Sequence, residues 1–178
     1  LAGIHSDWTH LTFGTSACLA ELNLVDVSLP AEEVRCYLLA KYTARFDLHP
    51  RLFEQAVASI FRHLGWHVIL TAYTADGGID VVLHNDTGER VGVQVKRWRG
   101  AVRVDQIREF AGSLLLGNYT RGIFITTSSY TRPAVTAAEQ LSAKTFPIEL
   151  LDAKRFYEIM KIPRFDKRWA RDRIQELM

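Results

Sequence analysis

Three side chains suited to phosphate and metal chemistry lie close together in the sequence, within the stretch from Gly77 to Lys96. Asp80 offers a carboxylate, Gln94 an amide oxygen and Lys96 an ammonium group. Carboxylate and carbonyl oxygens bind hard divalent cations. An ammonium group can orient a water molecule or stabilise charge on a phosphoryl group. If the fold brings the three together around a cation, they have the chemistry needed to hydrolyse a phosphodiester.

The stretch that carries these residues is predicted to be a β-hairpin. One apolar run contains Asp80, and a second contains Gln94 and Lys96. The Asn, Asp, Thr and Gly of residues 85–88, which join the two runs, are typical of a tight connection. Side chains alternate along a strand, so Gln94 and Lys96 share one face and the neighbouring valines occupy the other.

A further acidic residue, Glu54, lies on a predicted helix from about Pro50 to Leu64. The apolar residues of this segment form one stripe at helical spacing, and Gly65 ends the helix. Glu54 lies seven residues before Phe61, so the two are about 20° apart around the helix axis. Glu54 therefore borders the buried face, where a carboxylate is unusual unless it has a structural or functional role.

These residues belong to short motifs that follow one another along the chain. The motifs are Leu52-Phe53-Glu54, Gly77-Gly78-Ile79-Asp80, Gln94-Val95-Lys96, Val104-Asp105-Gln106-Ile107 and Gly122-Ile123-Phe124-Ile125-Thr126-Thr127. The ordered set resembles the Mrr-type branch of the PD-(D/E)XK restriction endonucleases, in which Gln commonly stands where other members carry Glu or Asp. The resemblance covers about residues 48–160.

The resemblance and the chemistry together assign catalytic roles. Asp80 is expected to be the principal metal ligand, with Gln94 and the backbone carbonyl of Val95 as further ligands. Glu54 would complete the site directly or through water, and Lys96 would act on the attacking water or the phosphate. The expected ion is Mg²⁺, with Mn²⁺ as a substitute. The structural alternatives are a loop-capping Asp80, an exposed polar Gln94, a surface Lys96 and a helix-start Glu54.

A second group of residues is expected to contact DNA. Basic side chains cluster directly after the site, an aromatic lies among them, and a glycine pair precedes Asp80. The alternatives are a solvated basic face, a tight glycine turn, an aromatic packed under its loop and a loop-capping threonine. The predicted DNA-contacting residues are Gly78, Arg97, Trp98, Arg99, Arg103 and Thr127.

The arrangement of predicted elements indicates an α/β fold. Strands in the middle of the chain are flanked by helices, which favours a restriction-endonuclease-like sandwich with a central mixed β-sheet. We expect an N-terminal helical arm or remnant of a preceding module at residues 1–45, the nuclease domain at 46–160 and a C-terminal helical tail at 161–178. Beyond the helix and hairpin above, strands are predicted at 66–73, 122–127 and 147–151, and helices near 30–42, 104–116, 132–143 and 152–160. Asp152 is predicted to cap the last of these helices.

Composition sets broad limits on the class of protein. The 178 residues are 48% hydrophobic and 24% charged, with a net charge of +2, so no basic field covers the whole molecule. Cys18 and Cys36 have neither metal-ligand nor redox spacing, and we expect reduced cysteines of a cytoplasmic protein. No apolar run approaches the roughly 20 residues that span a bilayer. Because the chain begins with Leu rather than Met, we expect a piece of something longer.

These observations lead to one functional expectation and two alternatives. We expect a metal-dependent DNA endonuclease domain of a bacterial restriction or anti-phage defence protein. A homodimer or higher oligomer is expected if both strands are cut, and a fused or separate sensor domain would choose the target. The alternatives are a structure-selective nuclease similar to Holliday-junction resolvases, and a catalytically silent module that binds nucleic acid.

Overall fold

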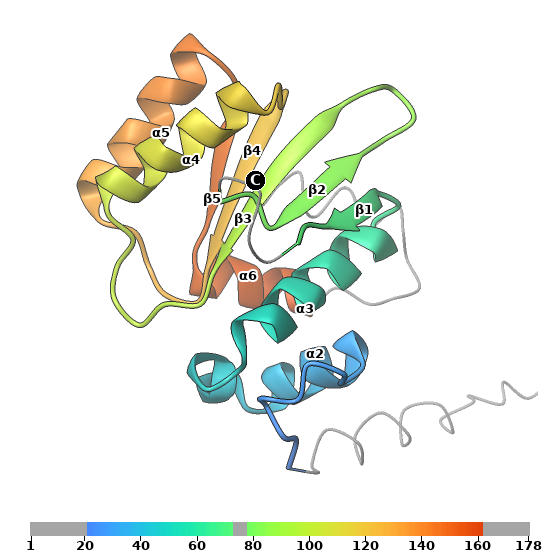
Figure 1. Ribbon diagram of the computed structural model, residues 1–178. Helices are drawn as coiled ribbons and strands as arrows, with labels where there is room; N and C mark the ends of the chain where they lie inside the picture. Colours follow the sequence, from blue (N-terminus) through green and yellow to red (C-terminus); the bar gives the residue numbers. More distant parts are fainter. Residues whose placement is uncertain (1–20, 73–77, 162–178) are drawn as a thin grey trace, which may run out of the picture.

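One mixed β-sheet organises the part of the chain that the structure describes, residues 21–72 and 78–161 of a computed structural model. The strand order is β1-β2-β3-β4-β5 (Figure 1). The strands are β1 (His67–Leu70), β2 (Val81–His84), β3 (Arg90–Lys96), β4 (Arg121–Thr126) and β5 (Ile148–Leu151). The helices are α2 (Ala31–Ala40), the 3-10 helix η1 (Tyr42–Phe46), α3 (Pro50–His63), α4 (Val104–Leu116), α5 (Arg132–Lys144) and α6 (Ala153–Met160). The predicted α/β class and mixed sheet are confirmed.

The central hairpin forms as predicted. Strands β2 and β3 pair antiparallel, with Val81 opposite Val93. The turn is closed by the Asn85 side chain, whose Oδ1 accepts hydrogen bonds from the backbone N–H groups of Thr87 at 3.1 Å and Glu89 at 3.0 Å. The turn residues therefore fix the register that brings the first strand alongside the second.

The other half of the sheet is parallel. Strand β3 pairs parallel with β4, and β4 with β5, so each connection must cross over the sheet through a helix. Helices α4 and α5 supply these crossovers and cover one face (Figure 1). Gly92 and Gly122 pair with each other beneath α4. A Cβ at Gly92 would lie 2.6 Å from Leu114 Cδ2, so glycine lets the helix approach closely.

Two apolar cores lie on opposite faces of the sheet. Helices α2, α3 and α6 pack over odd-numbered strand residues such as Val93 and Ile123. Helices α4 and α5 pack over even-numbered ones such as Val82 and Phe124. The predicted stripe of α3 is confirmed, since Phe53, Ala56, Val57, Ile60, Phe61 and Leu64 are all buried.

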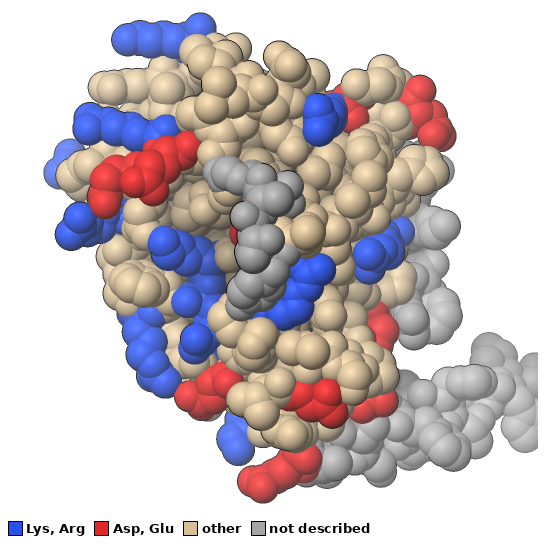
Figure 2. All heavy atoms as spheres, viewed as in Figure 1, with Lys and Arg blue, Asp and Glu red and all other residues tan. Residues whose placement is uncertain are grey.

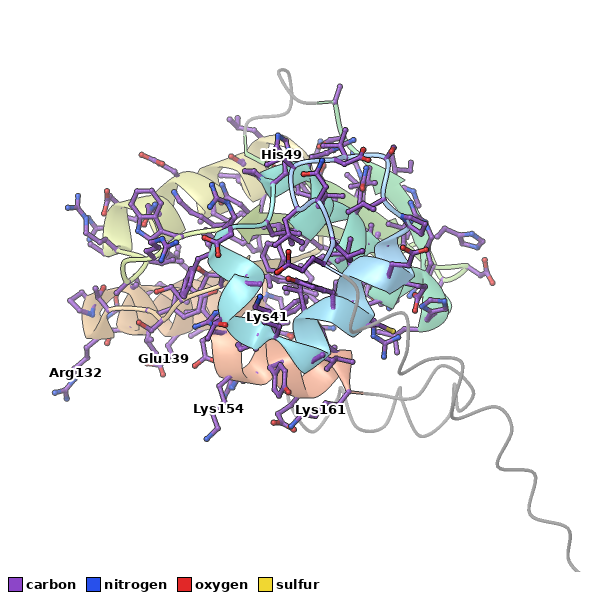
Figure 3. The ribbon with its side chains drawn as sticks, turned by 90° about the horizontal axis from the view of Figure 1, so that it is seen from below. Lys41, His49, Arg132, Glu139, Lys154 and Lys161 are labelled. Atoms are coloured by element: carbon purple, nitrogen blue, oxygen red, sulfur yellow. The ribbon has the colours of Figure 1, made fainter. Side chains whose placement is uncertain are left out.

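Helix α2 packs against the rest of the described chain. Its Val34 and Leu38 are fully buried in the same core as α3, and Arg35 donates hydrogen bonds to the Met160 carbonyl at 2.8 and 2.6 Å. Figure 3 shows α2 beside α6, whose Lys154 points away from the body. Whether residues 1–45 are an arm or a remnant of another module stays a prediction.

Several expectations concern the ends of elements or residues outside the described part. Asp152 caps α6 as predicted, accepting from Arg155 N at 2.8 Å. Cys36 is a free cysteine, whereas Cys18 and the tail from residue 162 lie outside the described residues. Within the described ranges, no helix combines the length and apolarity needed to cross a membrane.

Candidate active site

The carboxylate of Asp80 lies against the middle of the Gln-Val-Lys motif. Its Oδ2 accepts a hydrogen bond from the backbone N–H of Val95 at 2.7 Å, and its own N–H donates to the Val93 carbonyl at 2.9 Å. Val95 stands between Gln94 and Lys96 on β3. The hairpin therefore brings the predicted acid to the strand that carries the predicted amide and amine.

The side-chain amide of Gln94 lies beside Gly78, on the face of the sheet covered by α4. A Cβ built on Gly78 would be 3.1 Å from Gln94 Nε2, and Gly78 has a φ of +92°. The Oε1 atom of Gln94 is buried and has no hydrogen-bond partner within the part of the chain that the structure describes. Buried carbonyl oxygens rarely lack a partner, so this atom is in a position to receive a cation or a donor group.

Lys96 follows Gln94 on the same face and is partly exposed. Its Nζ lies 5.3 Å from the centroid of the Trp98 ring, within the range of a cation–π contact. The positive charge also reaches Asp105, whose pKa is lowered mainly by a hydrogen bond from Arg103 and to a smaller extent by Lys96.

Glu54 is buried, 8% exposed, and is engaged by a residue that sequence reasoning missed. Arg51 Nη1 donates to Glu54 Oε2 at 2.8 Å and to the Thr71 carbonyl at 3.0 Å. Thr71 in turn donates to the Asp80 carbonyl through its N–H and its hydroxyl, both at 3.0 Å. Glu54 is thus linked to the Asp80 backbone through Arg51 and Thr71. The i,i+3 spacing of Arg51 and Glu54 was the signal available in the sequence.

The loop after β3 divides the predicted DNA-contacting residues into two kinds. Thr127 is 1% exposed, and its hydroxyl bonds the backbone N and O of Trp98 at 2.8 and 3.0 Å. This favours the loop-holding role over the predicted DNA contact. Arg97 donates to the Phe46 carbonyl, which ties the loop to η1. Trp98 is 49% exposed, so it is partly open to solvent.

Arg99 and Arg103 extend outward and pair with neighbouring acids. Arg99 lies 3.0 Å from Asp47, and Arg103 lies 3.1 Å from Asp105. The two arginine side chains are 70% and 71% exposed, and exposed ion pairs are weak. Figure 2 shows Lys and Arg side chains gathered over the loop after β3 and the start of α4, with acidic side chains among them.

The donor set suits a hard divalent cation better than a soft one. Within residues 21–72 and 78–161, no three His, Cys, Asp or Glu side chains gather in a way that could hold a metal. The predicted ligands are instead one or two carboxylates, an amide oxygen and a backbone carbonyl. Such all-oxygen sets are typical of Mg²⁺, which keeps several waters and needs few protein ligands. The partnerless Gln94 Oε1 is consistent with this set.

Comparison with known proteins decides the family. Residues 46–160 match the Mrr-type catalytic domain of the restriction endonucleases. The chain belongs to the Mrr-type restriction endonuclease family. It is 33% identical to the type IV methyl-directed restriction enzyme EcoKMrr of Escherichia coli K12 over 121 residues, which are 64% of this chain and 38% of that protein. The chain therefore spans less than half the length of this relative.

Solved structures with the same fold include two other restriction endonucleases. The DNA modification-dependent restriction endonuclease AspBHI has a TM-score of 0.54 at 18% identity, covering 89% of this chain and 43% of that chain. MspJI restriction endonuclease, solved in complex with a 27-mer oligonucleotide, has a TM-score of 0.52 at 18% identity, with 89% and 38% covered. These likenesses confirm the predicted restriction-endonuclease-like fold.

Proposed function

We propose that this Mrr-type domain is a metal-dependent DNA endonuclease that hydrolyses phosphodiester bonds. Restriction endonucleases act on DNA, and the family generally uses divalent metal ions. The observation that carries the proposal is the Asp80 carboxylate bonded to Val95 N, between Gln94 and Lys96. An acid, an amide oxygen and an ammonium group are thereby gathered on one hairpin.

Each residue of the site has a distinct task in this proposal. Asp80, Gln94 and the Val95 carbonyl would hold Mg²⁺, or Mn²⁺ in its place. The ion would supply positive charge to the phosphoryl oxygens when bound. Lys96 would orient the attacking water or offset charge on the phosphoryl group with its ammonium. Water attacks phosphorus, the bond to the leaving oxygen breaks, and that oxygen takes up a proton.

Glu54 has a more indirect place than a simple metal ligand. Its Oε2 is already bonded to Arg51, whose charge opposes that of the carboxylate. We propose that Glu54 completes the metal site through water, while the hydrogen bond from Arg51 holds it in its buried position. Gly78 gives close access to the site, because a side chain there would press on the Gln94 amide.

The DNA would follow the exposed arginines after β3. Arg99 and Arg103 can exchange Asp47 and Asp105 for phosphates, because ion pairs at this exposure contribute little. Arg99→Ala and Arg103→Ala should each weaken binding to all sequences alike and reduce the salt slope of the affinity by about 1. A loss of affinity confined to one DNA sequence would contradict a contact with phosphate.

The wider setting belongs to the same proposal. We propose a cleavage domain of a bacterial restriction or anti-phage defence protein. A sensor domain would select the DNA, and two or more copies would be needed to cut both strands. The relative EcoKMrr is named methyl-directed, so methylated DNA is included in the test.

The test is cleavage of supercoiled plasmid, unmodified or methylated, and of a four-way junction, with Mg²⁺, with Mn²⁺ and with chelator. Asp80→Asn keeps an oxygen for the Val95 N–H but removes the charge, and Lys96→Met removes the ammonium group. Asp86→Asn, in an exposed turn, and Lys154→Met, on α6, are the matched controls. We expect metal-dependent cleavage that both site variants lose and both controls keep.

Other outcomes would replace the proposal. Preference for the four-way junction over plasmid would indicate a structure-selective nuclease. A folded protein that binds DNA but cleaves no substrate with either metal would indicate a silent binding module.

A further inference from the structure

Trp98 is the exposed aromatic residue next to the site, and its surroundings hold it in a defined place. The residue is 49% exposed, and a Cβ on Gly100 would lie 3.1 Å from the indole Nε1. The Lys96 ammonium lies 5.3 Å from the ring centroid. Because Lys96 and Trp98 are two apart in an extended segment, their side chains can meet on one side.

The backbone on both sides of this contact is held by the buried Thr127. Its N–H donates to the Lys96 carbonyl at 3.2 Å. Its hydroxyl accepts from Trp98 N at 2.8 Å and donates to the Trp98 carbonyl at 3.0 Å. The Thr127 carbonyl accepts from Arg45 Nε at 3.0 Å, so η1 is joined to the same point. One residue directly after β4 thus fixes the backbone at both Lys96 and Trp98.

We propose that Trp98 is a positioning residue for Lys96, with the Thr127 clamp, defined by these bonds, setting the distance between ring and ammonium. A flexible lysine stem loses precision when its end is free, and the face of a tryptophan attracts a cation. The ring would hold the ammonium toward the site before DNA arrives. This inference rests on the proposed function, since it assigns Lys96 to the reaction.

The first measurement does not depend on cleavage. In ¹H–¹³C spectra of the lysine Cε groups, the Lys96 signal is identified by its loss in Lys96→Arg. We expect its Hε protons to be shifted upfield by the indole ring current. Trp98→Phe should retain a shift and Trp98→Leu, which is apolar but not aromatic, should abolish it. If the Lys96 Hε chemical shift in the wild-type protein equals that of the exposed lysines, the proposal is overturned.

The second measurement separates positioning from DNA contact. Trp98→Leu should slow single-turnover cleavage by about two- to fivefold, the rate equivalent of an exposed cation–π contact. The affinity for duplex DNA in Ca²⁺, which does not support turnover in this test, should stay unchanged. Trp98→Phe should cleave at close to the wild-type rate. If Trp98→Leu weakens DNA affinity enough to account for the whole loss of rate, Trp98 is a DNA contact and not a positioning residue. An unchanged cleavage rate in Trp98→Leu would show that Trp98 does not position Lys96 for the reaction.

Two threonine variants test the clamp. Thr127→Ser keeps the hydroxyl and should preserve both the Lys96 shift and the rate. Thr127→Val keeps the shape but removes both side-chain bonds to Trp98, and should reduce both. Equal behaviour of the two variants would overturn the clamp. If the unchanged protein cleaves no DNA, the proposed function fails, and the spectra alone still decide whether Trp98 holds Lys96.

Discussion

Replacing Gly78 by alanine tests whether the Gln94 amide must lie where the structure places it. Gly78 has a φ of +92°, a conformation that costs an alanine about 1–2 kcal/mol. About 0.4–1 kcal/mol of this is offset because alanine restricts the unfolded chain. We therefore expect a net stability loss of about 1 kcal/mol, or about 2–4 °C in Tm.

The effect on the site has a separate cause. The new Cβ would lie 3.1 Å from Gln94 Nε2, so the amide must move by a few tenths of an ångström. This is the far end of a flexible side chain, and moving it adds little to the loss of stability. A displacement of 1 Å in a reacting group can slow a reaction about 100-fold, so a shift of this size should slow cleavage by about tenfold.

Gly88 is the matched control. Its φ is +83°, and a Cβ there would have no atom of residues 21–72 or 78–161 within 4 Å. Gly88→Ala should therefore lose about the same stability as Gly78→Ala and keep the unchanged cleavage rate. The assay is single-turnover nicking of supercoiled plasmid, with thermal unfolding of each variant in parallel. Equal rates for the two variants, or an unchanged rate for Gly78→Ala, would refute the reasoning about Gln94.

Three further perturbations have defined outcomes. Arg51→Met should lower the free energy of unfolding, measured in urea, by about 3 kcal/mol, because Glu54 is left buried without its ion-pair partner. Adding Glu54→Gln should recover most of this loss, and a double variant no more stable than Arg51→Met would contradict the reasoning. Gly112→Ala lies inside α4, where no atom of the described chain would come within 4 Å of the new Cβ, and it should stabilise the protein by up to about 1 kcal/mol. Gly122→Ala, whose Cβ would overlap a leucine of α4, should destabilise it by about 1–3 kcal/mol, and the same sign for both would be inconsistent with this packing. Burial raises the pKa of Tyr42 to about 12, so the contribution of its neutral hydroxyl to stability is complete below about pH 10 and is lost as the pH rises toward 12. The fall in Tm between pH 10 and 12 should be smaller in Tyr42→Phe than in the wild type, and an equal fall would contradict this role of Tyr42.

The sequence predicted the elements whose signals are local. The stripe of α3, the turn between β2 and β3 and the Asp152 cap each depend on residues close together in the chain, and all three formed as expected. The meeting of Asp80 with the Gln-Val-Lys motif was also within reach. Once the hairpin is placed, alternation along β3 decides which side chains share a face.

The supporting contacts were out of reach because they join distant segments. The Arg97 side chain reaches Phe46, and the Thr127 hydroxyl reaches Trp98. Neither partner can be read from spacing, since each pairing depends on how a loop lies across the end of the sheet. For this reason Thr127 was predicted to contact DNA, although its burial favours holding the loop.

Gln94 and Arg51 together determine how much negative charge lies around the proposed site. Gln94 is uncharged, and Arg51 opposes the charge of Glu54 at 2.8 Å. In the proposed site, Asp80 would then be the main source of attraction for a cation, and the charge of Lys96 would oppose it. A site of this kind should hold its ion weakly in the absence of substrate. The phosphate of bound DNA would add the missing negative charge, so metal and DNA should each raise the affinity for the other.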